Sequence, residues 1–557
     1  MKASIENPLS KYLAFGSFLT TVMVIAGPVS DPVNVPKFLI LGITAIGISY
    51  IFFTKGFLKN LKKHKSLVGL SSLFFFSSLN AILFSDAPFS QNLYGVYGRN
   101  TGFLTYLFFL ILLLVSAQFN TIKSVNRVLM GLLLAGLINI VYGLFATFFY
   151  DPIPWQNVYG AILGTFGNPN FSGSFYGLTA GVILTYILNR DISSKFRFSL
   201  ALFFIGNLYC VYRTDSTQGL LVFAISTSAI TWYFLFNNSR FRKFSYIFLF
   251  SFLTAGIIAV LGMLQQGPLK YYLYKRSVSL RGVYWEAAIQ TGLTKPFSGV
   301  GFDAFGDWYR RSRSLKAATT FPGQGVTTNA AHNYFLDMFA TGGIPLLISY
   351  LAITFFGLFM IIKILKRSRK FDPTFAILFM LYVGFQAQSI ISIPQIGLAI
   401  WGWLDIGLLY SYQFISASKI DPPTKNKKQN EFSLVNVGFF AFSLIGLLVV
   451  LPPYIADAKW TSALKSTQLP QVESALTQTY FTPSDSFRLA NAVLILAKSG
   501  LDEKAFNYVK QGINYNKDYY EAWRLMYFSN LSSEKEKALA LSNLKRLDPK
   551  NPEWKRI

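Results

Sequence analysis

Two histidines occur in this chain of 557 residues, and one of them, His332, lies where a proton-transfer group could act. It follows a polar stretch and directly precedes an apolar run that begins at Asn333. Imidazole has an ordinary pKa close to neutrality, so it can accept a proton from a hydroxyl group at physiological pH. A lone histidine is more often structural, but this position beside an apolar run favours a general base at a membrane surface.

Arg281 and Trp285 lie one helical turn apart, upstream of His332, and could share one face of a helix. A guanidinium offers a rigid fork of donors that matches phosphate oxygens, so Arg281 is a candidate anion clamp. The alternative is a pair of residues that anchors the chain at a membrane interface. Other basic residues of the same stretch could add to an anion site: Lys275, Arg276, Arg310, Arg311, Arg313 and Lys316.

Carboxylates and metal ligands give weaker signals. The acidic residues of this stretch have no spacing that is distinctive of an acid–base pair; they are Glu286, Asp303, Asp307 and Asp337. No cluster of His, Cys and carboxylate residues has the spacing of metal ligands, and the single cysteine, Cys210, lies in an apolar run. We therefore expect no metal and no cofactor.

Membrane helices must position these residues. The chain is 52% hydrophobic and 14% charged, whereas soluble domains carry about 25% charged residues. Its apolar runs approach the roughly 20 residues that cross hydrocarbon, without a regular alternation of polar residues. The sequence predicts an all-α, polytopic membrane bundle of about 12–13 transmembrane helices. The expected spans are 12–28, 37–54, 68–85, 102–119, 128–149, 171–188, 198–213, 218–236, 245–264, 343–363, 373–392, 398–417 and 433–453.

The net charge of +26 fits a membrane protein better than a nucleic-acid-binding one. Basic residues gather in short loops between apolar runs, and no nucleic-acid module is present, so we expect a lipid bilayer and no nucleic acid as partner. All basic loops fall on the same side of the predicted spans, which places the N-terminus in the cytoplasm. Loops 86–101, 150–170 and 265–333 then face outward. The third, within a catalytic outer loop of about 265–342, is unusually long, as functional loops often are.

Residues 454–557 lack a membrane run and are predicted to form a small extracytoplasmic domain after a membrane domain of residues 1–453. Two similar segments, 503–506 and 536–539, lie 33 residues apart. Helix pairs with a period near 34 are typical of tetratricopeptide repeats, which could hold an acceptor or a protein partner. The alternative is an ordinary helical tail.

Together these motifs resemble those of the O-antigen ligase and O-antigen polymerase superfamily. The family pattern runs Arg, Trp, P-x-x-G-x-G, His-Asn and a Gly pair. It is matched in order by Arg281, Trp285, Pro296–Gly301, His332-Asn333 and Gly342-Gly343. The stretches GTFGNPN (164–170) and YGRNTG (97–102) also look like outer-loop motifs of this family.

The resemblance implies a membrane glycosyltransferase at the outer face of the bacterial cytoplasmic (inner) membrane. Its donor would be a glycan on undecaprenyl diphosphate, and an acceptor hydroxyl would attack the anomeric carbon without a metal or nucleotide. His332 would be the general base, while Arg281 would hold the diphosphate and stabilise its growing charge. Further candidates for binding the donor or glycan are Trp285, Asn168, Asn333 and Arg276.

One position departs from the family pattern. The ligases often carry a second Arg in a Thr-x-Ser-Arg-Gly motif, and the matching position here is Gln218. Arg213, five residues earlier, could supply the missing charge, although it could equally be an interfacial anchor. Arg99 is another candidate clamp.

The acceptor and the protein class leave alternatives open. The acceptor could be lipid A core, a growing polysaccharide, or a protein Ser or Thr, as in a protein O-oligosaccharyltransferase of the same superfamily. A small-solute transporter is the alternative of another class. Transporters usually show internal repeats and charged or broken helices at the membrane midplane, and no convincing repeat is present here. Release of polyprenyl diphosphate would separate the two classes.

Overall fold

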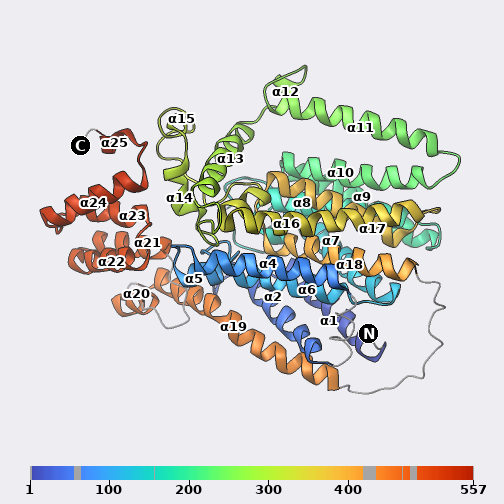
Figure 1. The fold of residues 1–557 in the computed structure, drawn as a ribbon, viewed down its shortest axis with the longest axis horizontal. Coiled ribbons are helices and arrows are strands. Elements are labelled where there is room, and N and C mark those ends of the chain that lie inside the picture. The colour runs from blue at the N-terminus through green and yellow to red at the C-terminus, as the bar shows by residue number, and fades with distance from the viewer. Residues whose placement is uncertain are drawn as a thin grey trace.

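The computed structural model of the chain describes residues 3–54, 64–155, 157–417, 434–466, 468–476 and 486–555. Within these residues all regular structure is helical and no strand occurs, which confirms the predicted all-α class. Long helices lie side by side along one direction, and shorter helices gather at one end of them (Figure 1).

A helix occupies each of the thirteen segments expected to span the membrane. These helices are α1 (Ala3–Val22), α2 (Asn34–Ser49), α4 (Lys65–Leu83), α6 (Phe103–Ser116), α7 (Ile122–Phe148), α8 (Pro169–Leu188), α9 (Ser194–Arg213), α10 (Thr217–Phe236), α11 (Arg242–Met263), α16 (Tyr334–Arg367), α17 (Pro373–Ile391), α18 (Ile396–Ala417) and α19 (Leu434–Lys465).

Nine of these helices are long and apolar enough to cross a membrane, counted over the described ranges. The other four are α1, α6, α9 and α18. Helix α6 has only 14 residues, fewer than a full span requires, yet most of its side chains are buried by neighbouring helices. Helix α18 is buried along nearly its whole length, and its Trp, Tyr and Asp residues lower its mean hydropathy. Sequence hydropathy therefore predicted the helices of the bundle correctly, while nine of them satisfy the length and composition of a span.

Basic loops and polar loops lie at opposite ends of the bundle (Figure 1). At the basic end, Ser368 Oγ donates to Asn237 Oδ1 at 2.9 Å, which joins the α16–α17 and α10–α11 connections. At the polar end, Asn34 Nδ2 donates to the Gly98 carbonyl at 2.8 Å. This segregation agrees with the alternation of loops in the sequence. Two further basic segments, 55–63 and 419–428, lie outside the described residues.

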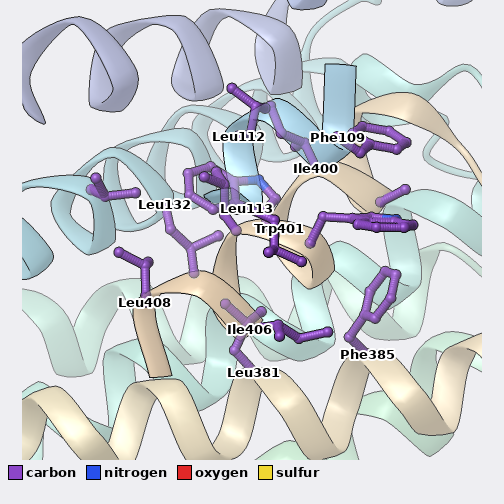
Figure 2. Close-up of a cluster of buried hydrophobic side chains, with 14 of the residues drawn as sticks. Phe109, Leu112, Leu113, Leu132, Leu381, Phe385, Ile400, Trp401, Ile406 and Leu408 are labelled. Atoms are coloured by element: carbon purple, nitrogen blue, oxygen red, sulfur yellow. The ribbon is translucent and has the colours of Figure 1, made fainter. Parts of the chain in front are cut away.

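Helix α18 runs through the middle of the bundle (Figure 2). The indole N–H of Trp401 donates to Thr21 Oγ1 at 2.8 Å, and that of Trp403 donates to the Tyr334 hydroxyl at 3.1 Å. Lipid tails are as apolar as leucine side chains, so this core is stabilised by close packing and by such hydrogen bonds. The Tyr334 bond fixes the start of α16, directly after His332. Apolar neighbours around Trp401 include Phe109, Leu112, Leu113, Leu132, Leu381, Phe385, Ile400, Ile406 and Leu408.

The C-terminal helices form a second unit with its own core. They are α20 (Leu469–Leu476), α21 (Ser486–Lys498), α22 (Asp502–Tyr515), α23 (Tyr520–Phe528), α24 (Glu534–Leu547) and α25 (Pro552–Lys555). Trp460, near the end of α19, belongs to this core and joins it to the membrane bundle. The similar segments 503–506 and 536–539 open α22 and α24, and Ser533 and Glu536 form a capping box at the latter. The helices follow the expected pairs, while their assignment to tetratricopeptide repeats stays a prediction.

Candidate active site

The polar loops meet around a cavity of about 910 Å³ at one end of the bundle. Four of the residues predicted from the sequence line it: Arg99, Asn168, Arg281 and His332. We call it the cationic cavity, after Arg99 and Arg281. Sequence positions more than 200 residues apart are thus brought to one place, as a joint role requires.

Helix α13 (Arg276–Thr294) presents one face to the cationic cavity. Ser277, Leu280, Arg281 and Tyr284 line the cavity, at the spacing of residues that share a helix face. Trp285, predicted to share that face, is only partly buried and does not line the cavity. The cavity face of α13 thus contains Tyr284, three positions after Arg281, and not Trp285, four positions after it; the role predicted for Trp285 stays a prediction.

The two arginines of the cationic cavity differ in their partners. Arg99 donates to the Asn329 carbonyl at 2.9 Å, and its Nε lies 3.7 Å from Asp303 Oδ1. In the part of the chain that the structure describes, no carboxylate pairs with Arg281. Burial lowers the pKa of Arg281, but a guanidinium whose ordinary value is 12.5 keeps its charge at neutral pH. Arg281 is therefore the cation of this cavity that most needs an anionic ligand.

Asp303 serves to join two loops. It accepts hydrogen bonds from the backbone N–H groups of Val96 and Thr101, each at 3.1 Å, and from the Thr101 hydroxyl at 2.7 Å. The carboxylate thereby fixes the 95–101 loop that carries Arg99. Its hydrogen bonds and ion pair account for its position without a role in acid–base chemistry. Across the described residues, no group of three His, Cys, Asp or Glu side chains could hold a metal ion.

His332 is held between two fixed neighbours. Asn333 caps α16 by accepting from the N–H groups of Phe335 and Leu336, at 3.0 and 3.1 Å. Ala331 N–H donates to Asp337 Oδ1 at 2.8 Å. Between them His332 adopts a left-handed backbone conformation with φ 55°, which is uncommon for a residue other than glycine and often marks a functional position.

The imidazole of His332 is kept in its neutral form. Its ring stacks on Tyr284, with 5.6 Å between ring centroids and 29° between planes. Burial, followed by the charges of Arg281 and Arg99, lowers the pKa of His332 to about 4. The imidazole of His332 is therefore unprotonated at neutral pH, the form that can accept a proton.

Glycines lock the segment before His332 to the helix after it. The Val300 and Gly301 N–H groups each donate at 2.9 Å to carbonyls of α16, those of Ala340 and Thr341. Helix α16 breaks at Gly342 and Gly343, and a Cβ on Gly299 would lie 2.3 Å from the Thr341 carbonyl. The P-x-x-G-x-G stretch and the Gly pair thus form one backbone contact that sets α13 against α16, and with them Arg281 against His332.

Of the remaining predicted residues, two asparagines cap helices and two arginines lie away from the cationic cavity. Asn168 lines the cationic cavity and also caps α8, accepting from Asn170 N–H at 2.9 Å. Asn333 uses its side-chain oxygen as a cap. Arg276 is exposed and stacks on Phe321, at 5.5 Å from guanidinium carbon to ring centroid, and Arg213 is exposed at the end of α9. Neither lines the cavity.

Gln218 does line the cationic cavity, and its side chain donates to Ser174 Oγ at 2.9 Å. The matching position therefore faces the cavity in this chain with a neutral amide. Arg213 does not line the cavity, whereas Arg99 lines it from a different loop. Three further residues of the lining were not singled out as site residues: Tyr97, which opens the YGRNTG stretch, Tyr284, which adjoins Trp285, and Asn329.

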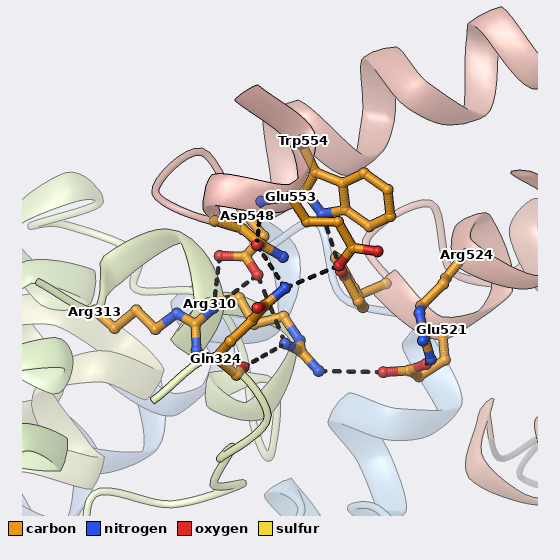
Figure 3. A network of polar contacts seen from close by, with 10 residues as sticks. Arg310, Arg313, Gln324, Glu521, Arg524, Asp548, Glu553 and Trp554 are labelled. Atoms are coloured by element: carbon orange, nitrogen blue, oxygen red, sulfur yellow. Dashed lines mark hydrogen bonds and ion pairs between the residues drawn. The ribbon is translucent and has the colours of Figure 1, made fainter. Parts of the chain in front are cut away.

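The basic run after α13 has partners that the sequence did not indicate (Figure 3). Arg313 forms two hydrogen bonds with the carboxylate of Asp548, at 2.8 and 2.9 Å, and both side chains are fully buried. Arg310 Nη2 lies 3.2 Å from Glu521, and Arg311 Nη2 lies 2.7 Å from Asp518. These three arginines hold the C-terminal domain against the loop that follows α13. Their predicted contribution to an anion-binding site is therefore not supported.

A comparison with protein families places these features in context. The model of the O-antigen ligase family matches residues 200–351, from α9 to the first half of α16. The match contains Arg281, the glycine-rich stretch and His332, and it ends before the C-terminal domain. No curated protein matches the chain. The segment that carries the candidate site thus matches the O-antigen ligase family, which supports placing this membrane protein in the O-antigen ligase superfamily.

Proposed function

We propose that this protein transfers or polymerises a glycan from undecaprenyl diphosphate onto an acceptor hydroxyl, at the outer face of the bacterial cytoplasmic membrane. The observation that carries the proposal is a neutral imidazole beside an unpaired guanidinium in one cavity, inside the segment matched by the O-antigen ligase family. A diphosphate is the kind of ligand that such a guanidinium recognises.

The chemistry assigned to the side chains is acid–base and electrostatic. His332 takes the proton of the acceptor hydroxyl as its oxygen forms a bond to the anomeric carbon of the donor. The bond from that carbon to the phosphate oxygen breaks, and the polyprenyl diphosphate leaves with the electron pair. Arg281 and Arg99 stabilise the charge that grows on the diphosphate, a role in which a single donor is worth about 10²–10³ in rate.

Arg281 and Arg99 also affect the pKa of the proposed general base, His332. Their charges, together with burial, lower the pKa of His332 to about 4. A bound diphosphate would offset these charges and raise the pKa of His332, which strengthens the base only when the donor is in place. No metal or nucleotide is assigned a part in this reaction.

The proposed location follows from the loops. Basic residues at one end of the bundle favour the cytoplasm for that end and for the N-terminus. The candidate site and the C-terminal domain then lie outside, where a lipid-linked donor can supply the glycan. The acceptor could also be a protein hydroxyl, as in a protein O-oligosaccharyltransferase, and a transporter is the alternative of another class.

The test measures glycan transfer and polyprenyl diphosphate release by purified protein with its lipid-linked donor. His332→Ala is expected to lose about 10²–10⁴-fold in rate. His64→Ala is the matched control, because the other histidine pairs with Tyr410 away from the cavity. Arg281→Ala is compared with Arg190→Ala, an exposed arginine in the α8–α9 connection. Normal transfer by both His332→Ala and Arg281→Ala would overturn the mechanism, and wild-type protein that releases no polyprenyl diphosphate would favour transport.

A further inference from the structure

A second cavity, of about 680 Å³, lies between the catalytic loop and the C-terminal domain. Its loop side includes Asp307 and Arg310 of α14 (Phe305–Ser312). Its other side is formed by three successive residues at the start of α23: Tyr519, Tyr520 and Glu521. We call it the aromatic cavity, after its tyrosines. The family match ends far before α23, so the side of this cavity that the C-terminal domain forms lies outside the match.

The aromatic and cationic cavities share a wall. Both are lined by Tyr97, Gly98, Tyr284, Asn329 and His332. His332 therefore borders both spaces, with Arg281 lining only the cationic one. A base that serves a two-substrate transfer must reach the hydroxyl of one substrate while the anion of the other lies close by, and a position on a shared wall satisfies both needs.

The charges of the aromatic cavity are already balanced. Arg310 lies 3.2 Å from Glu521, and Arg488 lies 2.7 Å from Asp457. Burial raises the pKa of Asp307 to about 6, and its carboxylate accepts hydrogen bonds from Gln91 at 3.3 Å and Asn516 at 3.1 Å. The cavity thus offers no unpaired cation to an anionic ligand among the described residues.

Its remaining lining suits a polyhydroxylated ligand. Tyr97, Tyr284, Tyr519 and Tyr520 add aromatic surface to the lining, although Arg488, His332 and Arg310 already contact the rings of Tyr97, Tyr284 and Tyr520, respectively. Carboxylates and amides offer hydrogen-bond partners for hydroxyl groups. A few well-placed polar groups in a partly aromatic cavity are typical of ligand sites. The aromatic cavity is therefore suited to a neutral glycan, whereas the cationic cavity is suited to a diphosphate.

We infer that the aromatic cavity binds the acceptor, that the acceptor is a neutral glycan, and that the C-terminal domain forms one wall of this site. The inference rests on the proposed function, since it assigns the second substrate of that reaction. The acceptor hydroxyl reaches His332 from the aromatic side and attacks the donor held on the cationic side. The Arg310–Glu521 contact ties the start of α23 to α14, and the buried Arg313–Asp548 pair holds the end of α24, which packs against α23 (Figure 3). The wall is therefore a fixed part of the site.

The experiment separates acceptor binding from chemistry in the full-length purified protein. Three probes are used: glycan released from the donor by mild acid, delipidated core oligosaccharide, and a Ser/Thr-rich peptide. Their affinities are measured for the wild type, Tyr519→Ala, Tyr519→Phe and Glu521→Gln. At least one glycan should bind the wild type, and Tyr519→Ala should weaken it about five- to tenfold, while Tyr519→Phe, which keeps the ring, retains binding. Glu521→Gln tests the same wall without a change in size, and should raise the KM for acceptor while the KM for donor stays unchanged.

Two outcomes would overturn the inference. One is glycan binding that is unaffected by both Tyr519→Ala and Glu521→Gln in folded protein, and the other is binding of the peptide alone. His332→Ala distinguishes this failure from failure of the proposed function. If His332→Ala abolishes transfer while the Tyr519 and Glu521 variants bind and use the acceptor normally, only the proposed acceptor site is wrong. If His332→Ala transfers glycan at the normal rate, the proposed function itself fails.

Discussion

Arg281 and Arg313 belong to the same outer loop region, yet they lie in opposite electrostatic settings. Arg313 is fully buried and holds Asp548 with two hydrogen bonds, whereas Arg281 lines a cavity and has no carboxylate partner in the described structure. A cation that is already neutralised holds structure together, and a cation without a partner is available to a ligand. The comparison teaches that the position of carboxylates, more than the number of arginines, marks the candidate diphosphate site.

The largest effect is expected from the loss of Arg313, the arginine that holds the C-terminal domain in place. Arg313→Ala leaves the buried Asp548 carboxylate with Arg310, at 3.6 Å, as its remaining cationic partner among the described residues. Loss of one partner of a buried pair typically costs about 3–5 kcal/mol. Hydrogen exchange over residues 486–555 should report a loosened C-terminal domain. Arg313→Met combined with Asp548→Leu should recover most protection, and unchanged exchange in Arg313→Ala would contradict this role.

Arg281→Ala tests the ligand-binding side. We expect kcat/KM for the lipid-linked donor to fall about 10²–10³-fold, because the departing diphosphate loses its main stabilising charge. Arg281→Lys keeps the charge but not the planar fork, so it should recover only part of the rate. Helicity and hydrogen exchange should stay as in the wild type, and a loss of rate that simply follows unfolding would contradict a specific role.

The pH dependence tests how the arginines act on His332. The pKa of His332 lies at about 4, so the base form persists on lowering the pH until that value is approached. The profile of kcat/KM, which reports the free enzyme, should therefore lose activity on its acid side only near pH 4. The profile of kcat should lose activity at higher pH, because bound diphosphate raises the pKa of His332. Coincident profiles with an acid limb near pH 6.5 would contradict this electrostatic coupling.

Arg311→Ala should have the smallest effect. Its partner Asp518 also pairs with Arg546 at 2.8 Å, and these two charges, acting against burial, lower the pKa of Asp518. Because one partner remains, we expect a loss of about 1 kcal/mol or less in the stability of the domain and little change in transfer. A loss of transfer rate as large as that of Arg281→Ala would contradict the comparison. It would mean that pairing with a carboxylate does not distinguish a structural arginine from one that binds the ligand.

Much of the fold could be predicted from the sequence. Long apolar runs fix where helices form in a membrane, because every backbone polar group there must bond within its own helix. A bundle helix therefore occupies each expected span, although α1 and α16 begin, and α19 ends, well outside the expected bounds. His332, Arg281, Arg99 and Asn168, which were singled out as polar residues in motifs beside such runs, line one cavity, and their roles stay predictions.

The remaining features depend on contacts between distant segments. The partner of Arg313 is Asp548, 235 residues away, and no local pattern indicates that pair. The roles of Asp303 and Asn333 could not be read from residue type, because carboxylates and amides serve equally well in catalysis, loop anchoring and helix capping. The choice between Tyr284 and Trp285 required the actual rotation of α13.

The measurement that tests the central claim most directly is single-turnover release of polyprenyl diphosphate from the lipid-linked donor. Wild-type protein and His64→Ala should release it at similar rates when a glycan acceptor is present. His332→Ala should release it about 10²–10⁴-fold more slowly while still binding donor. Release by His332→Ala at the wild-type rate would contradict the account, because the neutral imidazole beside Arg281 would then have no part in the reaction.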